Sequence, residues 1–242
     1  MSREKIMNQG CFIVIEGTDG SGKTTQLKLL SKRFNLLNKK VLFADFPRYY
    51  RSPWGKLVGD FLSGKLGKFE EIDPHLAVLT YMLDEYTWSR DIGRPWVENG
   101  GIILSNRYFT SNVHQIAKLK TIARKKYRNW LWRMGYKELG ILKPDLVVFL
   151  DVPWQIGRKL IEKKKARLYL KGRKKDLAEK DSEHQKSAYK EYLYTVSHHR
   201  EWLKIRCISG RKLDKPEVIH NRVWKLVDKR FKLSSSPPLL SS

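Results

Sequence analysis

Short apolar runs alternate with longer amphipathic segments along this chain, a pattern typical of a parallel α/β sheet. The apolar runs lack the polar alternation of half-exposed strands, so we expect strands that are covered on both faces. Five such strands are predicted, at residues 12–15, 41–43, 102–104, 146–150 and 206–208. The sequence therefore predicts an α/β fold in which helices flank a five-stranded parallel sheet.

Segments with an apolar residue at every third or fourth position fill the gaps between the predicted strands. Asp73 followed by Pro74 predicts the N-cap and the first residue of one helix. Four helices are marked by Leu27, Leu30, Phe34 and Leu37, by Leu76, Leu79 and Leu83, by Ala188, Tyr192, Thr195, His199 and Trp202, and by Val223, Leu226 and Val227. Because no internal repeat is visible, we expect one domain over residues 10–232, between a flexible N-terminus (1–9) and a disordered tail (233–242).

Composition narrows the class of protein. The chain has 242 residues, of which 41% are hydrophobic, enough for a sizeable core. No apolar run approaches the roughly 18 residues of a membrane span, and the N-terminus lacks a signal-type apolar stretch. Cys11 and Cys207 are too few for a disulfide framework and lie in apolar runs, so we predict buried free thiols. These features together predict a cytoplasmic protein without a membrane partner.

The charge is strongly basic, with 49 Lys and Arg against 25 Asp and Glu and a formal net charge of +24. A nucleic-acid ligand is one explanation, and a pocket for nucleotide phosphates or solvated basic faces is another. We favour the second, although the charge leaves nucleic acid open. The segment 124–130 mixes basic and aromatic residues as RNA-binding surfaces do. However, Tyr127, Trp130, Leu131 and Met134 have helical spacing, which predicts an amphipathic helix with its aromatic residues packed inward.

A glycine-rich loop carries the clearest chemistry. Residues 17–24, GTDGSGKT, match the phosphate-binding pattern G-x-x-x-x-G-K-[ST], with a predicted strand before them and a helix after them. In such a loop the backbone N–H groups surround phosphate oxygens, Lys23 reaches the β- and γ-phosphates and the Thr24 hydroxyl ligates Mg²⁺. The predicted ATP-binding residues here are Gly17, Thr18, Asp19, Gly20, Ser21, Gly22, Lys23, Thr24 and Thr25. The sequence therefore predicts ATP and Mg²⁺ as ligands.

A GTPase would need an N-K-x-D segment to read the base, and the sequence has none. Instead, the chain resembles thymidylate kinases from about Phe12 to the final helix, through landmarks in a matching order. The landmarks are 16–25, 46–49, 81–84, 106–108, 143–146 and a basic segment centred on Arg173. The resemblance implies a three-layer P-loop NTPase fold with a helical basic lid at about 163–180, and a homodimer. It also implies Mg²⁺-dependent transfer of the ATP γ-phosphate to thymidine monophosphate (dTMP), giving dTDP and ADP.

The resemblance also implies a role for each matching position. Asp19 matches the acid that bonds the 3′-hydroxyl of the acceptor sugar, and Tyr81 matches the aromatic residue that stacks on thymine. Arg48 and Arg107 match arginines that hold the acceptor phosphate. The acceptor-binding set is therefore Asp19, Phe46, Arg48, Tyr81, Glu85, Arg107, Ser111 and Gln115, with the last two at the base.

The chemistry of the reaction explains why several Lys and Arg residues are predicted at the site. The acceptor phosphate is largely ionised at neutral pH, so the enzyme must mainly hold two polyanions in line and neutralise the moving phosphoryl group. Family members without an arginine in the phosphate loop supply one from the lid, and Gly20 puts this chain in that class. The lid candidates are Arg167, Lys171, Arg173, Lys174 and Lys175, with Arg167 and Arg173 over ATP. The predicted catalytic residues are Lys23, Arg48, Arg107 and Arg173.

Three positions depart from the family pattern. Asn106 replaces an acid expected to orient Mg²⁺, and it can still contact the metal through water. Asp19, Asp176 and Glu179 are candidates to supply the missing charge. Glu85 stands where the family has an arginine at the base; it accepts from an amino group when ionised and donates to the thymine carbonyl only when protonated. Exposure to solvent, or pairing with Arg90 or a lid residue, is an equal alternative for Glu85. The segment 111–115 is one residue shorter than usual.

These departures keep other functions open. The chain could phosphorylate another nucleoside monophosphate or a deoxynucleoside. It could also bind nucleotide as a paralogue without turnover, or use its charge to bind nucleic acid. Base specificity is the part of the hypothesis that the sequence determines least.

Overall fold

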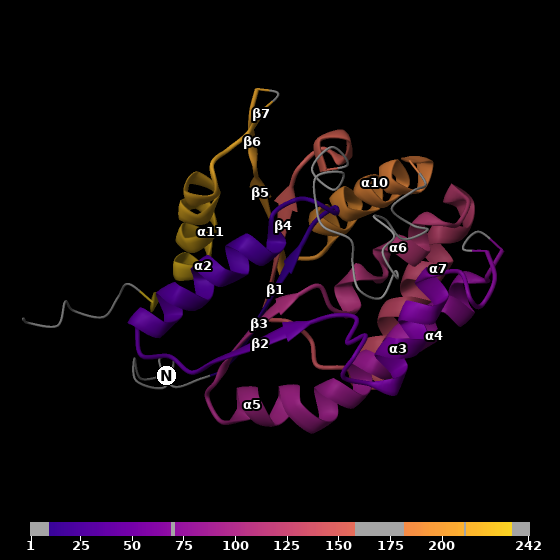
Figure 1. The fold of residues 1–242 in the computed structure, drawn as a ribbon, viewed down its shortest axis with the longest axis horizontal. Coiled ribbons are helices and arrows are strands. Elements are labelled where there is room, and N and C mark those ends of the chain that lie inside the picture. The colour runs from indigo at the N-terminus through magenta and orange to yellow at the C-terminus, as the bar shows by residue number, and fades with distance from the viewer. Residues whose placement is uncertain (1–9, 69–70, 158–181, 211, 234–242) are drawn as a thin grey trace, which may run out of the picture.

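A computed structural model describes residues 10–68, 71–157, 182–210 and 212–233 of the chain. In these residues, parallel strands form a five-stranded sheet in the order β2-β3-β1-β4-β5 (Figure 1). The strands are β1 (Cys11–Glu16), β2 (Val41–Asp45), β3 (Ile102–Asn106), β4 (Leu146–Asp151) and β5 (Trp202–Arg206). The first four confirm the predicted strands, and the sheet confirms the predicted fold class.

Helices cover both faces of this sheet and make three layers. On one side lie α2 (Lys23–Leu36) and α11 (Pro216–Phe231), and on the other lie α4 (Pro74–Trp88), α6 (Val113–Ala117), α7 (Thr121–Arg133) and α10 (Ser182–His198) (Figure 1). Alternate residues of β1 serve the two layers. Ile13 and Ile15 pack in the cluster with α2 and α11, whereas Phe12 and Val14 pack in the cluster of the opposite face. Burial on both sides explains the unbroken apolar runs of β1, β3 and β4. The edge strands β2 and β5 are only partly buried, contrary to the expectation that every strand is covered on both faces.

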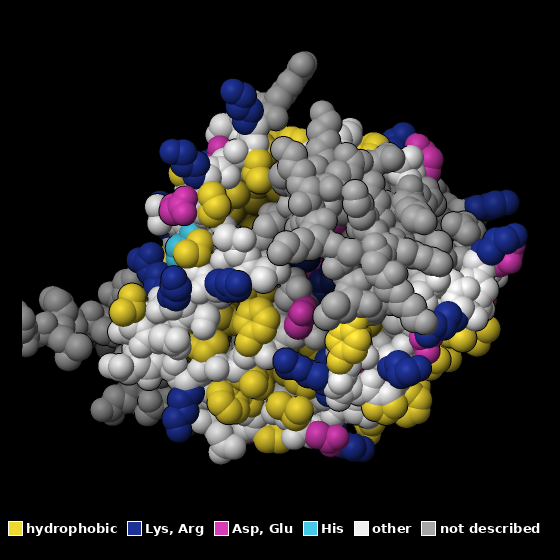
Figure 2. Space-filling view, viewed as in Figure 1, with side chains coloured by type: hydrophobic (Ala, Val, Ile, Leu, Met, Phe, Trp, Pro, Cys, Tyr) yellow, Lys and Arg dark blue, Asp and Glu magenta, His cyan; other side chains and the backbone are white. Residues whose placement is uncertain are grey.

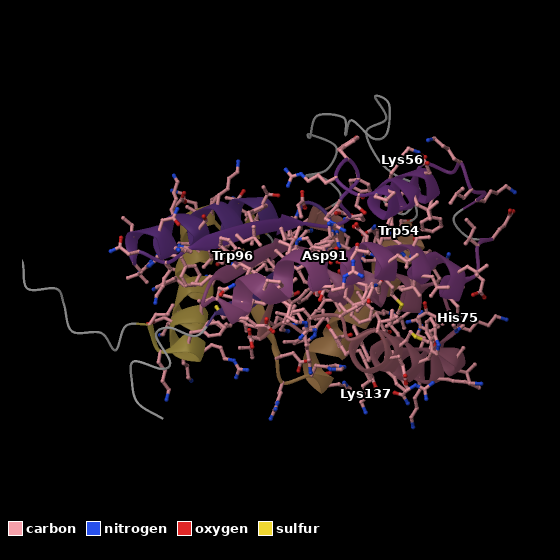
Figure 3. All side chains as sticks on the ribbon, turned by 90° about the horizontal axis from the view of Figure 1, so that it is seen from below. Trp54, Lys56, His75, Asp91, Trp96 and Lys137 are labelled. Atoms are coloured by element: carbon pink, nitrogen blue, oxygen red, sulfur yellow. The ribbon has the colours of Figure 1, made fainter. Side chains whose placement is uncertain are left out.

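Three consecutive helical elements form one continuous segment between β2 and β3. It consists of α4, the π-helical turn η1 (Ser89–Gly93) and α5 (Arg94–Glu98). The predicted N-cap is confirmed, because the Asp73 carboxylate accepts a hydrogen bond of 2.7 Å from the His75 backbone N–H. Figure 3 shows His75, Asp91 and Trp96 marking the beginning, the π turn and the end of this segment. Helix α3 (Pro53–Leu62) packs against α4, and this pair carries several residues of the candidate site.

Shorter elements complete the fold. A 3₁₀ turn, η2 (Phe109–Asn112), follows β3, and a π turn, η3 (Met134–Glu138), follows α7. A small hairpin of β6 (Ile208–Ser209) and β7 (Lys212–Leu213) follows β5. Helix α7 confirms the amphipathic segment, since Tyr127 and Leu131 are buried and Trp130 packs against the same core. The two cysteines are free and buried, as predicted.

The sequence misplaced the fifth strand and the end of the helix before it. Helix α10 ends at His198, and β5 begins at Trp202, so the predicted strand at 206–208 begins about four residues late. Trp202 lies at helical spacing from both His199 and Ile205, and in β5 the side chains of Trp202 and Ile205 pack on opposite faces of the sheet. Pairing of β5 with β4 from Trp202 to Arg206 places both residues in a strand.

The leucines that mark one face of helix α4 are exposed. Leu76, Leu79 and Leu83 are 63%, 41% and 38% exposed, and the opposite face, with Val78 and Met82, packs into the core. The predicted lid at 163–180, the first nine residues and the end of the tail lie outside the described residues. Within the residues that are described, no helix is long and apolar enough to cross a membrane.

Candidate active site

The glycine loop joins the end of β1 to the first turn of α2, at the carboxyl edge of the sheet. Gly17, Gly20 and Gly22 have φ angles of 151°, 83° and 90°, which L side chains rarely adopt. The Lys23 amine lies within the loop and donates to the carbonyl oxygens of Gly17 and Thr18, at 3.0 Å each. Thr24 and Thr25 are exposed at the start of α2. This arrangement leaves backbone N–H groups, an ammonium and a hydroxyl at a helix N-terminus, as phosphate binding requires.

Gly20 is confined by a close neighbour as well as by its backbone. A Cβ atom at Gly20 would clash with the carbonyl oxygen of Gly157, and a Cβ at Gly157 would clash with that of Asp19. The backbone of the loop is therefore in direct contact with the backbone of the helical turn that follows β4. An arginine side chain at position 20 does not fit. The candidates to replace it, Arg167, Lys171, Arg173, Lys174 and Lys175, lie outside the described residues.

Arg107 connects the loop to the opposite side of the site. Its guanidinium donates to the Asp19 carboxylate at 2.7 Å, and to the hydroxyls of Ser111 and Tyr192 at 3.3 Å each. Burial opposes its charge, but the nearby Asp19, Tyr192 and Glu16 raise the pKa of Arg107 well above its ordinary value. Its φ of 64° is unusual for a residue other than glycine. A fixed cation thus stands beside the phosphate loop.

The fully buried carboxylate of Glu16 lies close to this arginine. Glu16, the last residue of β1, accepts hydrogen bonds from Thr110 (2.6 Å), Ser111 (2.7 Å) and Tyr192 (2.9 Å). It lies 3.9 Å from the Arg107 guanidinium. Because buried charges need such partners, this network holds Arg107 in place. Ser111, predicted at the base, belongs to this network.

Arg48 is held by helix α4. Its Nε and backbone N–H donate to the two oxygens of the Asp84 carboxylate, both at 2.9 Å, and its Nη2 donates to the Asp84 carbonyl and the Thr87 hydroxyl. The preceding Phe46–Pro47 peptide bond is cis. Phe46 itself is buried between the rings of Trp88 and Tyr108. The structure therefore places Phe46 in the core and Arg48 at the wall formed by α4.

The predicted base-contacting residues lie on α4 and on the segment after β3. Tyr81 is half-buried against Phe61, and Glu85 follows it by one helical turn. Glu85 is only 2% exposed, and burial, with the Asp84 and Glu16 charges, raises its pKa well above the ordinary value. Its carboxyl accepts a hydrogen bond of 3.4 Å from Asn112. The site therefore contains a buried carboxyl group whose surroundings favour its neutral form.

Gln115 offers an unused acceptor in this region. The residue is 2% exposed. Among the described residues, its Oε1 atom has no hydrogen-bond partner. A buried amide oxygen without a partner is costly, so a donor from outside the protein would stabilise it.

Asp45 and Asn106 end the neighbouring strands β2 and β3 and pair in the register of the sheet. The Asn106 side-chain amide donates to the Asp45 carboxylate at 2.6 Å. The Asn106 oxygen is buried and has no partner in the described part of the chain. With the Thr24 hydroxyl, these oxygens suit Mg²⁺, a hard cation that prefers oxygen ligands and keeps several waters. No cluster of three or more His, Cys, Asp or Glu occurs among the described residues.

Several residues of the site were not predicted from the sequence. Glu16 and Asp84 gave a usable signal, because each is an acid beside a segment predicted to be buried. Asn112 and Asp45 gave none, since polar residues next to a turn are ordinary. Tyr192 could not be found from sequence, because it lies 176 residues from the carboxylate it bonds.

The chain is similar in sequence to known thymidylate kinases. The sequence model of the thymidylate kinase family matches residues 15–214. The probable thymidylate kinase of Thermococcus kodakarensis is 27% identical over 90% of this chain and 97% of its own length. The thymidylate kinase of Mycobacterium tuberculosis is 30% identical over 71% and 79%, and the probable enzyme of Thermococcus gammatolerans is 31% identical over 60% and 66%.

A solved structure resembles the fold over nearly the whole chain. It is the thymidylate kinase of Candida albicans, with a TM-score of 0.68 and 20% identity. The superposition covers 92% of this chain and 94% of that one.

Proposed function

Because the chain belongs to the thymidylate kinase family, we propose that it transfers the γ-phosphate of ATP to dTMP, giving dTDP and ADP. One observation carries the proposal beyond a generic ATPase: Asp19 of the phosphate loop is bonded to Arg107 at 2.7 Å. A loop that binds the donor phosphates therefore lies directly against a fixed cation that can take the phosphate of an acceptor.

The chemistry needs little more than these groups. An oxygen of the acceptor phosphate attacks the γ-phosphorus, the bond to the β-phosphate oxygen breaks and ADP leaves. Lys23 exchanges its bonds to the loop carbonyls for the donor phosphates, and Arg107 neutralises the acceptor phosphate. The Thr24 hydroxyl would hold Mg²⁺ bound with ATP, and the ion would supply positive charge on the donor phosphates. Arg167 or Arg173 supplies the cation that Gly20 cannot carry.

Recognition of the acceptor base involves Tyr81, Glu85, Asn112 and Gln115. A neutral carboxylic acid both donates and accepts a hydrogen bond, so a protonated Glu85 can donate to the thymine carbonyl. The free Gln115 oxygen can accept from the N–H of the same ring. Arg48 acts at the acceptor phosphate from the wall where Asp84 holds it.

We also propose a cytoplasmic homodimer. Its supporting feature is the apolar stripe on α4, formed by Leu76, Leu79 and Leu83, which lie at helical spacing and are all exposed. Two copies of such a stripe can pack against each other about a two-fold axis.

The decisive test measures ADP release with a panel of dTMP, dUMP, dCMP, dAMP and dGMP. We expect dTMP to be the best acceptor, and turnover of dCMP or dUMP without dTMP would overturn the assignment. Lys23→Ala should abolish transfer, whereas Lys28→Ala, an exposed lysine of the same helix, should leave turnover unchanged. Normal turnover by Lys23→Ala would refute the assignment of the site, and nucleotide binding without any turnover would indicate a non-catalytic paralogue.

Nucleic-acid binding is the alternative from another class. Figure 2 shows Lys and Arg side chains spread around the visible face, among apolar and acidic side chains. A nucleic-acid site usually gathers its cations along one face. Salt-sensitive retention of single-stranded nucleic acid, with no monophosphate turned over, would favour this alternative.

A further inference from the structure

The ends of β2 and β3 hold a carboxylate in an unusual place beside the phosphate loop. Asp45 pairs with Asn106 in the sheet register, and Asn106 pairs with Ile15 of β1, two residues before the loop begins. The Asp45–Asn106 hydrogen bond of 2.6 Å joins the two side chains. The pair is therefore positioned by three adjacent strands, at the carboxyl edge where α/β sheets bind ligands.

The surroundings of Asp45 are those of a nucleotide site. Lys23 of the loop, Arg107 and Arg51 all act electrostatically on its carboxylate. The residue is exposed, but burial around its carboxyl is the largest effect and raises the pKa of Asp45, against the lowering effect of Asn106 and these cations. The same cations attract phosphates, and a carboxylate among them would repel a nucleotide unless a cation lies between the two.

Asn106 adds a second observation that points to a ligand. Its amide nitrogen is used on Asp45, and its oxygen is buried without a partner in the described residues. An acceptor of this kind needs a donor, and an asparagine oxygen cannot supply negative charge. A water bound to a metal ion is a strong donor that would satisfy both this oxygen and the neighbouring carboxylate.

Building on the kinase reaction proposed above, we propose that Asp45, held by Asn106, is the carboxylate that binds the water shell of the nucleotide-bound Mg²⁺. The acid that β3 lacks at Asn106 is thus supplied by the adjacent strand β2. Asp45 provides the charge, and Asn106 provides a second acceptor and fixes the carboxylate. Both are positioning residues for the metal, because they act on its waters.

The test measures Mn²⁺ binding by electron paramagnetic resonance, with the protein saturated by a non-hydrolysable ATP analogue. Outer-shell partners typically contribute about 10–100-fold to metal affinity, so Asp45→Asn should weaken Mn²⁺ binding at least tenfold. Asp91→Asn removes a surface carboxylate that pairs with Arg90 and serves as the matched control, with unchanged Mn²⁺ binding. Affinity for the analogue without metal should stay the same in both variants.

A charge exchange separates this role from general electrostatics. Adding Asn106→Asp to Asp45→Asn moves the carboxylate to β3 and should restore Mn²⁺ affinity to within about threefold of the original. Thermal unfolding without metal verifies that each variant is folded. Unchanged Mn²⁺ affinity in Asp45→Asn, or no recovery on exchange, would overturn the proposal. A rise in KM for dTMP with normal Mn²⁺ binding would also overturn it. Because metal binding is read without turnover, the result is independent of whether dTMP is the acceptor.

Discussion

Replacing Glu85 by glutamine tests the claim that a protonated acid lies in the acceptor site. The substitution keeps the size of the side chain and an oxygen that can accept from Asn112. It removes only the titration, so stability should respond to pH differently in the two proteins. Glu85 is 2% exposed, and solvent will therefore do little to mask the effect.

The sign follows from the direction of the shift. In the unfolded chain a glutamate ionises near its ordinary pKa of 4.5, whereas burial, Asp84 and Glu16 raise the native pKa of Glu85 well above that value. Above pH 4.5 the unfolded state therefore binds fewer protons than the native state, and the free energy of unfolding falls as pH rises. The loss is about 1.4 kcal/mol per pH unit until the native pKa is reached.

The assay is urea unfolding of both proteins from pH 4.5 to 7.5, with the free energies of unfolding compared at each pH. The glutamine variant should become progressively more stable relative to the original protein as pH rises. Groups elsewhere titrate in both proteins and cancel in the difference. A difference that does not vary with pH would refute a protonated Glu85, and a difference of the opposite sign would show that the charged form is stabilised.

Two further substitutions test the packing of the loop and the proposed dimer. Gly20→Ala should reduce the free energy of unfolding by about 1–3 kcal/mol more than Gly140→Ala does. Both glycines have positive φ, but only Gly20 faces the Gly157 carbonyl. Equal losses of stability in the two variants would contradict the contact. Leu79→Glu should convert the dimer to monomer in sedimentation velocity, whereas Leu36→Glu, at a leucine of α2 that is 83% exposed, should not. A Leu79→Glu dimer of unchanged stability would exclude the α4 stripe.

Local patterns were sufficient for much of the fold. The unbroken apolar runs gave β1 to β4, and Asp73–Pro74 gave the beginning of α4, because burial on two faces and helix capping depend on neighbouring residues. The start of β5 was missed because Trp202 keeps helical spacing with His199 and Ile205, and only the pairing with β4 shows that it belongs to a strand.

The candidate site was only partly accessible to the same reasoning. The loop from Gly17 to Thr24 was found because one segment carries all its chemistry. The Arg48–Asp84 and Asp45–Asn106 contacts join segments 36 and 61 residues apart. Such pairs depend on strand order and on which helix packs where. Composition and spacing do not contain that information.

The backbone contact between Gly20 and Gly157 also restricts how this chain can evolve. In this chain, a single mutation that introduced a side chain at position 20 would meet a backbone atom and would lose the fold of the loop before it gained a catalytic group. An arginine in the loop would therefore require that the turn at Gly157 be displaced first. Gly20 and Gly157 therefore constrain each other, because a side chain at position 20 meets the Gly157 backbone and one at position 157 meets the Asp19 backbone.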